Sequence, residues 1–152
     1  MILPIDEIKL IGLSLKTKTT NLNGQSHIDC KALWHQFEDA KYAEIIPDKI
    51  GTEIYGVYFG YEGDHTKPFR YFIGCKVHSY AANCTHLQTL TIPAGNYHKI
   101  VVKGKMPDCM IEAWKNIWAA KIPRSYQVDF EVYDERSKDW NNAEVAIYLS
   151  VK

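Results

Sequence analysis

The sequence lacks an excess of charge of either sign. Its 18 Lys and Arg residues are matched by 18 Asp and Glu residues, so the formal net charge is zero. Nucleic-acid phosphates and anionic membrane surfaces attract proteins through a positive field, which a balanced chain does not produce. We therefore expect no direct nucleic-acid partner and no membrane partner.

The sequence also has no long apolar run, and its first residues do not show the pattern of a secretory leader. No stretch approaches the roughly 18 apolar residues of a membrane span. The start, Met1 to Glu7, has neither the basic segment nor the long apolar core of a signal peptide. The cysteines are few and scattered, which favours reduced thiols over a disulfide framework: Cys30, Cys75, Cys84 and Cys109. These absences predict a soluble, cytoplasmic protein.

The common enzymatic motifs are absent as well. There is no Gly-rich phosphate loop, nucleophile elbow or metalloprotease motif. Cys75, His78, Cys84 and His86 come nearest to a metal-ligand set, but Cys75 and His78 are three residues apart on or beside a strand and tend to point oppositely. We expect no metal site and no cofactor. The sequence favours binding over catalysis, although missing motifs do not exclude an enzyme.

Aromatic residues, in contrast, are plentiful, with ten Tyr, five Phe and four Trp. Large rings with polar tips suit both cores and ligand pockets. A chain of 152 residues that is 46% apolar can bury a sizeable core. We expect one domain over residues 1–152.

The first half of the chain predicts the order β-α-β-β. Residues 8–17 alternate as a strand does. Ser26 and Asp29 resemble a helix-capping box, and apolar residues at helical spacing predict a helix from Ser26 to Ala43. Two strands, at 53–61 and 69–77, then flank turn-forming residues.

The second half repeats this order. A strand at 87–92 leads through a turn to another at 96–103, and Pro107 suits the start of a helix that Ile122 and Pro123 close. Strands at 128–133 and 144–151 follow. Two repeats, at about 5–80 and 86–152, predict an α+β fold with pseudo-two-fold symmetry, an antiparallel sheet with helices packed on it, and a ligand groove at the seam.

A succession of short motifs in the second half carries a family resemblance. In order they are Ile92–Tyr97, Lys103-Gly104, Ala113-Trp114, Ile117-Trp118, Pro123–Tyr126 and Phe130–Tyr133. This succession resembles the gyrase-inhibitor-like small-molecule-binding family, which also supplies the effector domain of AraC-type and MerR-type multidrug-responsive regulators. More loosely, the chain is similar to the stand-alone cationic-drug-binding modules of integron cassettes.

The resemblance implies a role for one glutamate. In that family, a glutamate on the strand after the second helix lies in an aromatic pocket and pairs with cationic, lipophilic ligands, and Glu131 matches its position. The family's regulators carry a separate helix-turn-helix domain, for which the effector-like unit leaves no room here. The resemblance therefore implies a stand-alone binding module. On pattern alone, Glu131 would be an ordinary solvent-facing strand residue.

Strand alternation suggests which side chains surround Glu131. It places Tyr133 on the face of Glu131 and Phe130 on the other face, which we expect to pack on the helices. The side chain of Tyr148 is expected to point away from the apolar face of the last strand. It would then lie on the same face of the sheet as Glu131. For Tyr133 and Tyr148, cross-strand packing is an equally good interpretation.

The first repeat gives less guidance. Alternation permits either the face of Tyr55 and Phe59 or the opposite face, with Ile54, Gly56 and Tyr58, to line the groove, and we favour Tyr55 and Phe59. Trp34 lies beside the apolar stripe of the first helix and could cap the groove. Trp114 and Trp118, at i and i+4, are expected in the core.

Together these features predict a protein that senses or sequesters hydrophobic, aromatic, cationic small molecules. One alternative is a hydrolase of small electrophilic compounds with Glu131 as general base. Another is an interaction protein of the gyrase-inhibitor type. Exposed strand edges permit either a monomer or a homodimer.

Overall fold

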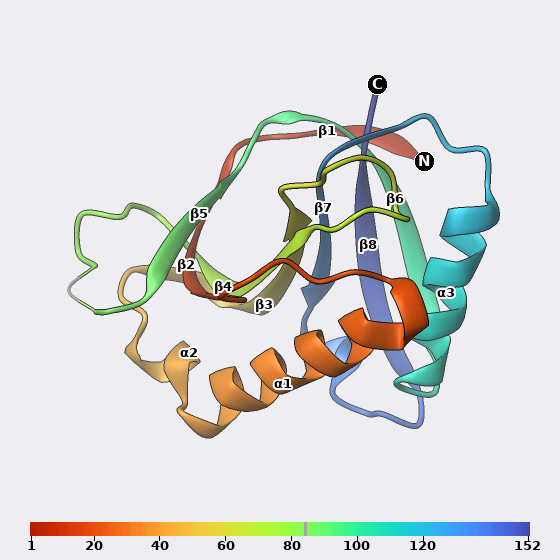
Figure 1. The fold of residues 1–152 in the computed structure, drawn as a ribbon. Helices are drawn as coiled ribbons and strands as arrows, with labels where there is room; N and C mark the ends of the chain where they lie inside the picture. The colour runs from red at the N-terminus through yellow and green to blue at the C-terminus, as the bar shows by residue number, and fades with distance from the viewer. Residues whose placement is uncertain (84) are drawn as a thin grey trace.

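The computed structural model describes residues 1–83 and 85–152 and has an α+β architecture built on one antiparallel sheet (Figure 1). Its strands are β1 (Ile2–Ile5), β2 (Ile8–Ser14), β3 (Lys49–Phe59), β4 (Arg70–Val77), β5 (Gln88–Ile92), β6 (Gly95–Gly104), β7 (Arg124–Tyr133) and β8 (Ala143–Val151). The helices are α1 (Gln25–Asp39), α2 (Tyr42–Ile45) and α3 (Asp108–Ala119), with two short 3-10 turns at Leu22–Gly24 and Glu135–Ser137.

The strand order is symmetric about its middle. The order is β1-β6-β8-β7-β3-β4-β2-β5, with β3 and β7 paired at the centre. On either side of this pair lie first β4 and β8, then β2 and β6, and at the two edges β5 and β1. Each half is therefore a β-β-α-β-β unit, and the units exchange their first strands, because β1 pairs with β6 and β5 with β2. The α+β fold with pseudo-two-fold symmetry is confirmed. The sequence prediction missed β1, a short edge strand.

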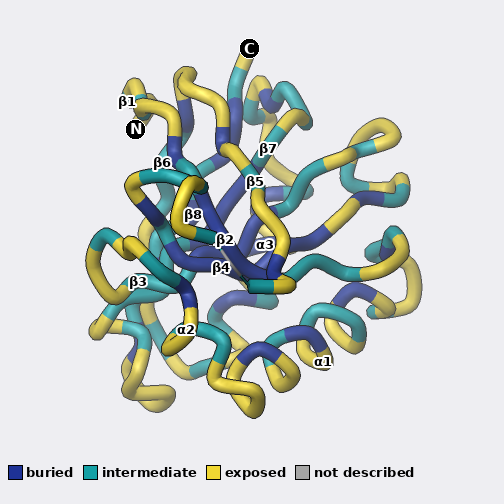
Figure 2. Tube along the Cα trace, turned by 90° about the vertical axis from the view of Figure 1, so that its left-hand side faces the viewer, coloured by how far each residue is buried: buried dark blue, intermediate teal, exposed yellow. Residues whose placement is uncertain are grey.

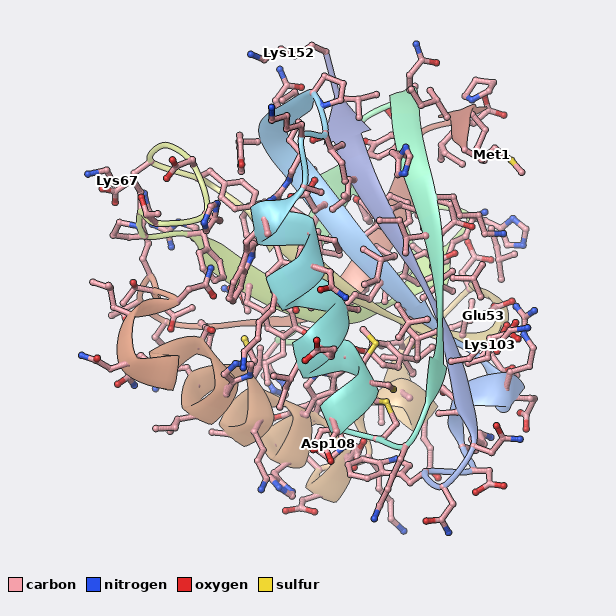
Figure 3. The ribbon with its side chains drawn as sticks, turned by 90° about the vertical axis from the view of Figure 1, so that its right-hand side faces the viewer. Met1, Glu53, Lys67, Lys103, Asp108 and Lys152 are labelled. Atoms are coloured by element: carbon pink, nitrogen blue, oxygen red, sulfur yellow. The ribbon has the colours of Figure 1, made fainter. Side chains whose placement is uncertain are left out.

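Each helix covers the outer strands of its own half. Leu33 and Phe37 of α1 pack against residues of β2 and β4, including Ile11 and Ile73. In the second half, Met110, Trp114 and Ile117 of α3 pack against apolar residues of β6 and β8. Figure 3 shows α3 lying across the sheet beside α1. The central strands β3 and β7 thus form a seam between the two helices.

A second core lies on the other face of the sheet, which curls over itself (Figure 1). It collects Leu10, Val57, Ile92 and Phe130 from β2, β3, β5 and β7, without a helical residue. Figure 2 shows buried residues concentrated in the central strands, whereas the exposed residues lie mostly in the loops and along α1. The prediction that Phe130 faces the helices is therefore wrong, because in a curled sheet both faces bury apolar residues.

The start and end of α1 also differ from the prediction. The helix begins at Gln25 without a side-chain cap, and Ser26 lies inside it, donating to Asn21 Oδ1 at 2.9 Å. Asp29 accepts a hydrogen bond from Thr19 Oγ1 at 2.6 Å, so no capping box forms. Lys41, with a φ of 54°, breaks the helix before α2. In the described part of the chain, we find no helix with both the length and the apolar character to cross a bilayer.

Candidate functional site

A pocket of about 990 Å³ opens over the seam between the two halves. Its floor is formed by side chains of β3, β4 and β7, and its walls by α1 and α3. The pocket lies there because α1 packs mainly on β2 and β4 and α3 mainly on β6 and β8, so the two helices meet the central pair only along their inner edges. The groove predicted at the seam is thus present.

Glu131 lies in the floor of this pocket. It lies near the C-terminal end of β7, opposite Gly56 of β3, and its exposed fraction is only 2%. Oε1 accepts a hydrogen bond from Tyr133 Oη at 2.7 Å. Oε2 accepts hydrogen bonds from Trp114 Nε1 at 2.7 Å and from Tyr58 Oη at 3.1 Å. The buried carboxylate is therefore held by donors from both halves of the molecule.

Burial raises the pKa of Glu131 above its ordinary value. The hydrogen bonds from Tyr133, Trp114 and Tyr58 favour the charged form and act in the opposite direction, but they offset only part of the lost hydration. Burial and the nearby Glu131 carboxylate also raise the pKa values of the Tyr58 and Tyr133 hydroxyls. These phenols stay protonated and can keep donating hydrogen bonds to Glu131.

Aromatic rings surround the carboxylate. The Trp34 ring of α1 stands edge-on to Tyr133, with centroids 4.9 Å apart, and its Nε1 donates to Tyr71 Oη at 2.8 Å. Tyr58 packs between Tyr71 and Trp114, with centroid distances of 4.8 and 5.0 Å. These contacts orient the rings through partners on other elements, so the pocket wall is built before any ligand arrives.

Gly56 makes room for this arrangement. A Cβ atom at position 56 would lie 2.5 Å from Tyr71 Oη and 3.2 Å from Glu131 Oε1. The first distance is shorter than van der Waals contact permits, so a side chain here would displace Tyr71 or the carboxylate. A glycine inside a strand often marks such a close approach.

A buried ion pair lies at one end of the pocket. Arg124 Nη2 donates to Asp129 Oδ2 at 2.6 Å, and both side chains are almost fully buried. The Asp129 carboxylate also accepts hydrogen bonds from Tyr61 Oη at 2.7 Å and from the Ser150 backbone N–H at 2.9 Å. The Arg124 guanidinium lies 4.3 Å from the centre of the Tyr126 ring. Arg124 is thus paired with Asp129, and among the described residues no Lys, Arg or His side chain forms a salt bridge with Glu131.

Three of the residues predicted for the site come together in the pocket: Glu131, Tyr133 and Trp34. Tyr148 does not join them, because it stacks on Phe130 on the other face of the sheet, with centroids 4.7 Å apart. The prediction that Tyr148 shares a surface with Glu131 is therefore wrong.

Tyr55 and Phe59 lie on that other face as well. The preference for their face of β3 was wrong, and the alternative face, with Ile54, Gly56 and Tyr58, is the one that lines the pocket or its floor.

Sequence reasoning missed two direct partners of Glu131. Trp114 was expected in the core, and it does pack there, but its indole N–H also reaches the carboxylate. A buried indole N–H usually needs an acceptor, which could have indicated this role. Tyr58 was not predicted as a pocket residue, because the sequence analysis favoured the opposite face of β3, with Tyr55 and Phe59.

Metal-ligating groups do not gather in the described part of the chain, where no cluster of three or more His, Cys, Asp or Glu side chains occurs. Cys75 is buried in the core beside α1, whereas His78 is exposed. Cys84 lies outside the described residues. Cys30 lines the pocket, and burial raises the pKa of its thiol, so this cysteine stays protonated.

Residues 1–151 match the family described as Cass2, integron-associated effector binding protein. The chain belongs to this family. Members of an effector-binding family bind small molecules, which agrees with the pocket at the seam. Among curated proteins, YobU of Bacillus subtilis (strain 168), named as a candidate transcriptional regulator, is 25% identical over 123 residues, covering 79% of this chain and 75% of YobU.

Solved structures share the fold. The integron cassette protein VCH_CASS2, from the mobile metagenome of Vibrio cholerae, has a TM-score of 0.75 and 24% identity, and the match covers all of this chain and 95% of that one. SAV2435, solved bound to tetraphenylphosphonium, has a TM-score of 0.77 and 16% identity, covering all of this chain and 93% of SAV2435. The eight-stranded curled sheet is therefore a fold that occurs in effector-binding proteins.

Proposed function

We propose that this member of the family binds hydrophobic, aromatic, cationic small molecules in the pocket at the seam, with Glu131 as the recognising charge. The observation that carries the proposal is the carboxylate of Glu131, buried in the floor of an aromatic pocket without a basic partner among its hydrogen-bond donors. A cation that enters the pocket supplies the missing positive charge.

The energetics favour a cation that is also apolar. An ion with a strongly held water shell would lose a large hydration free energy on entering the pocket. A cation whose charge is delocalised over aromatic groups or shielded by them is weakly hydrated and loses much less. Ring faces such as those of Tyr58, Trp34 and Trp114 add cation–π attraction of about 0.5 to 2 kcal/mol each. The volume of about 990 Å³ is enough for a molecule with several rings.

The fold comparison supports the same ligand class. SAV2435 binds tetraphenylphosphonium, a cation whose charge is surrounded by four phenyl rings, on the fold that this chain shares. We extend that ligand class to the present pocket because of its own residues, namely a buried carboxylate with aromatic neighbours.

The test is calorimetric titration of tetraphenylphosphonium into the wild type and Glu131→Gln. We expect saturable one-to-one binding that the substitution weakens by about tenfold or more. Glu112→Gln is the matched control, because Glu112 is an exposed glutamate of α3 outside this pocket, and it should bind as the wild type does. Equal affinities of the wild type and Glu131→Gln, with both proteins folded by circular dichroism, would overturn the proposal.

A further inference from the structure

Trp140 is an exposed aromatic residue at the pocket rim. Its exposed fraction is 59%, and it lies in the connection between β7 and β8. Single exposed apolar residues are common and need no explanation by themselves. Trp140 differs from exposed residues such as Leu22 and Ile28 because it lines the pocket and they do not.

The rim around Trp140 is otherwise polar or small. On α1, its exposed residues are His27, Lys31, His35 and Glu38, and on other elements they are Thr52, Pro107, Glu135 and Lys138. In the described part of the rim, Trp140 is thus the one exposed residue with a large apolar surface. The less exposed apolar side chains of Met106, Met110 and Ile111 line the same pocket.

The backbone of Trp140 is held in place, although its ring is not packed. Its carbonyl oxygen accepts a hydrogen bond from the Met106 N–H at 2.7 Å, which ties the β7–β8 connection to the start of α3. Figure 1 shows this connection running beneath α1 beside the start of α3. The Asp139 carboxylate accepts a hydrogen bond from the Asn141 N–H at 3.0 Å, which fixes the following turn.

The other three tryptophans have ring partners. Trp34 contacts Tyr133, Trp114 contacts Tyr58, and Trp118 stacks on His65 with an angle of 4° between the planes. Within residues 1–83 and 85–152, we find no ring packed against Trp140. A ring with a fixed backbone, open faces and a position beside a pocket is well placed to stack on a planar ligand at small entropic cost.

We infer that Trp140 forms an outer stacking subsite, and that the pocket therefore takes elongated ligands whose cationic part lies near Glu131 and whose second planar aromatic group reaches the rim. This inference rests on the proposed function and adds a ligand class to it. The inner site recognises charge, and the outer site selects for length and a second flat ring.

The experiment compares two cations that share the inner contacts and differ in reach. Benzyltrimethylammonium is short, whereas rhodamine 6G carries its charge on a long, flat, multi-ring body. Both cations are titrated into the wild type, Trp140→Ala, Trp140→Phe and Ile28→Ala. Ile28→Ala is the control, because it truncates a similarly exposed apolar side chain of α1 that lies outside the pocket.

We expect Trp140→Ala to weaken rhodamine 6G binding by about three- to tenfold and to change benzyltrimethylammonium binding by less than about twofold. Trp140→Phe should restore most of the loss, and Ile28→Ala should change neither affinity. Tryptophan emission should also shift to shorter wavelength when rhodamine 6G binds the wild type, by more than it does in Trp140→Phe.

Two outcomes overturn the outer subsite while leaving the proposed function intact. In one, rhodamine 6G binds Trp140→Ala as it binds the wild type. In the other, both cations lose affinity equally, which means that Trp140 supports the pocket as a whole. If the wild type binds tetraphenylphosphonium but not rhodamine 6G, the inference alone fails, and if it binds none of the three cations, the proposed function fails as well.

Discussion

Trp114 of α3 donates its indole N–H to Oε2 of Glu131 on β7 at 2.7 Å. This bond joins the helix of the second half to the central strand pair, and it holds the carboxylate in the pocket floor. The same indole packs in the core with Val145 and Ile147, so its position is fixed by apolar contacts independent of Glu131. The site and the core thus share a residue.

Trp114→Phe should destabilise the fold by about 1 to 3 kcal/mol, because a buried carboxylate oxygen loses a charge-assisted donor while most of the apolar contact remains. Urea unfolding measures this difference. Trp118→Phe is the matched control, since Trp118 stacks on His65 and makes no hydrogen bond to Glu131. A larger loss in Trp118→Phe than in Trp114→Phe would contradict the importance of the bond.

Gly56→Ala should abolish most cation binding, because the added Cβ would lie 2.5 Å from Tyr71 Oη and force the pocket floor to rearrange. Gly95→Ala provides the comparison, since a Cβ there meets its nearest neighbour at 3.9 Å. Titration with tetraphenylphosphonium measures both variants. Binding by Gly56→Ala equal to that of Gly95→Ala would show that the floor tolerates the methyl group and that its geometry does not govern affinity.

Cation affinity should depend on pH through Glu131. Burial raises the pKa of this carboxyl above 4.5, and only the charged form attracts a cation. The affinity of the wild type should therefore rise as the pH increases through the raised pKa and level off above it. Glu131→Gln should show no such rise. Titrations across this range measure it, and parallel profiles for the two proteins would assign the dependence to another group.

The same raised pKa has the opposite effect on stability. The folded protein holds the Glu131 proton more tightly than the unfolded chain does, so the free energy of unfolding should fall as the pH rises from about 4.5 through the raised pKa. Glu131→Gln lacks this contribution. The stability of the wild type relative to Glu131→Gln should therefore decrease over that window, as urea unfolding at several pH values can measure.

The buried pair of Arg124 and Asp129 should matter for folding. Arg124→Met leaves the Asp129 carboxylate buried without its cation, a change that typically costs about 3 to 5 kcal/mol. Arg136→Met removes the guanidinium from an exposed pair with Asp134, and its urea midpoint should stay close to that of the wild type. If Arg124→Met unfolded at the wild-type midpoint, the pair would not be a stabilising element.

The sequence predicted the duplicated fold and the seam because helical and strand periods recur in both halves. It could not assign the faces of β3, since both carry aromatic or apolar residues: Tyr55 and Phe59 on one, Ile54 and Tyr58 on the other. The alternation of side chains along β3 separates its two faces, but it does not show which face packs against the helices. In a sheet that curls around a second core, the apolar face and the helical face need not coincide, as Phe130 illustrates.

Glu131 was placed at the site through its position in a family motif and Tyr133 through strand alternation, whereas the other two partners depend on contacts between distant elements. Tyr58 and Trp114 lie 73 and 17 residues away from it in sequence. Gly56 offered an unused indication, because a glycine inside a strand that is otherwise apolar and aromatic suggests that another group approaches closely. Gly56 lies opposite Glu131 because β3 pairs with β7, and this pairing could not be predicted from the sequence.

The most direct test of charge recognition uses two ligands of nearly the same shape and opposite charge. Tetraphenylphosphonium and tetraphenylborate both place four phenyl rings around a central atom. If Glu131 recognises positive charge, the wild type should bind the phosphonium at least about tenfold more tightly than the borate, and Glu131→Gln should lose most of this difference. Equal affinity of the wild type for both ions would contradict the account and leave an aromatic pocket that selects by shape alone.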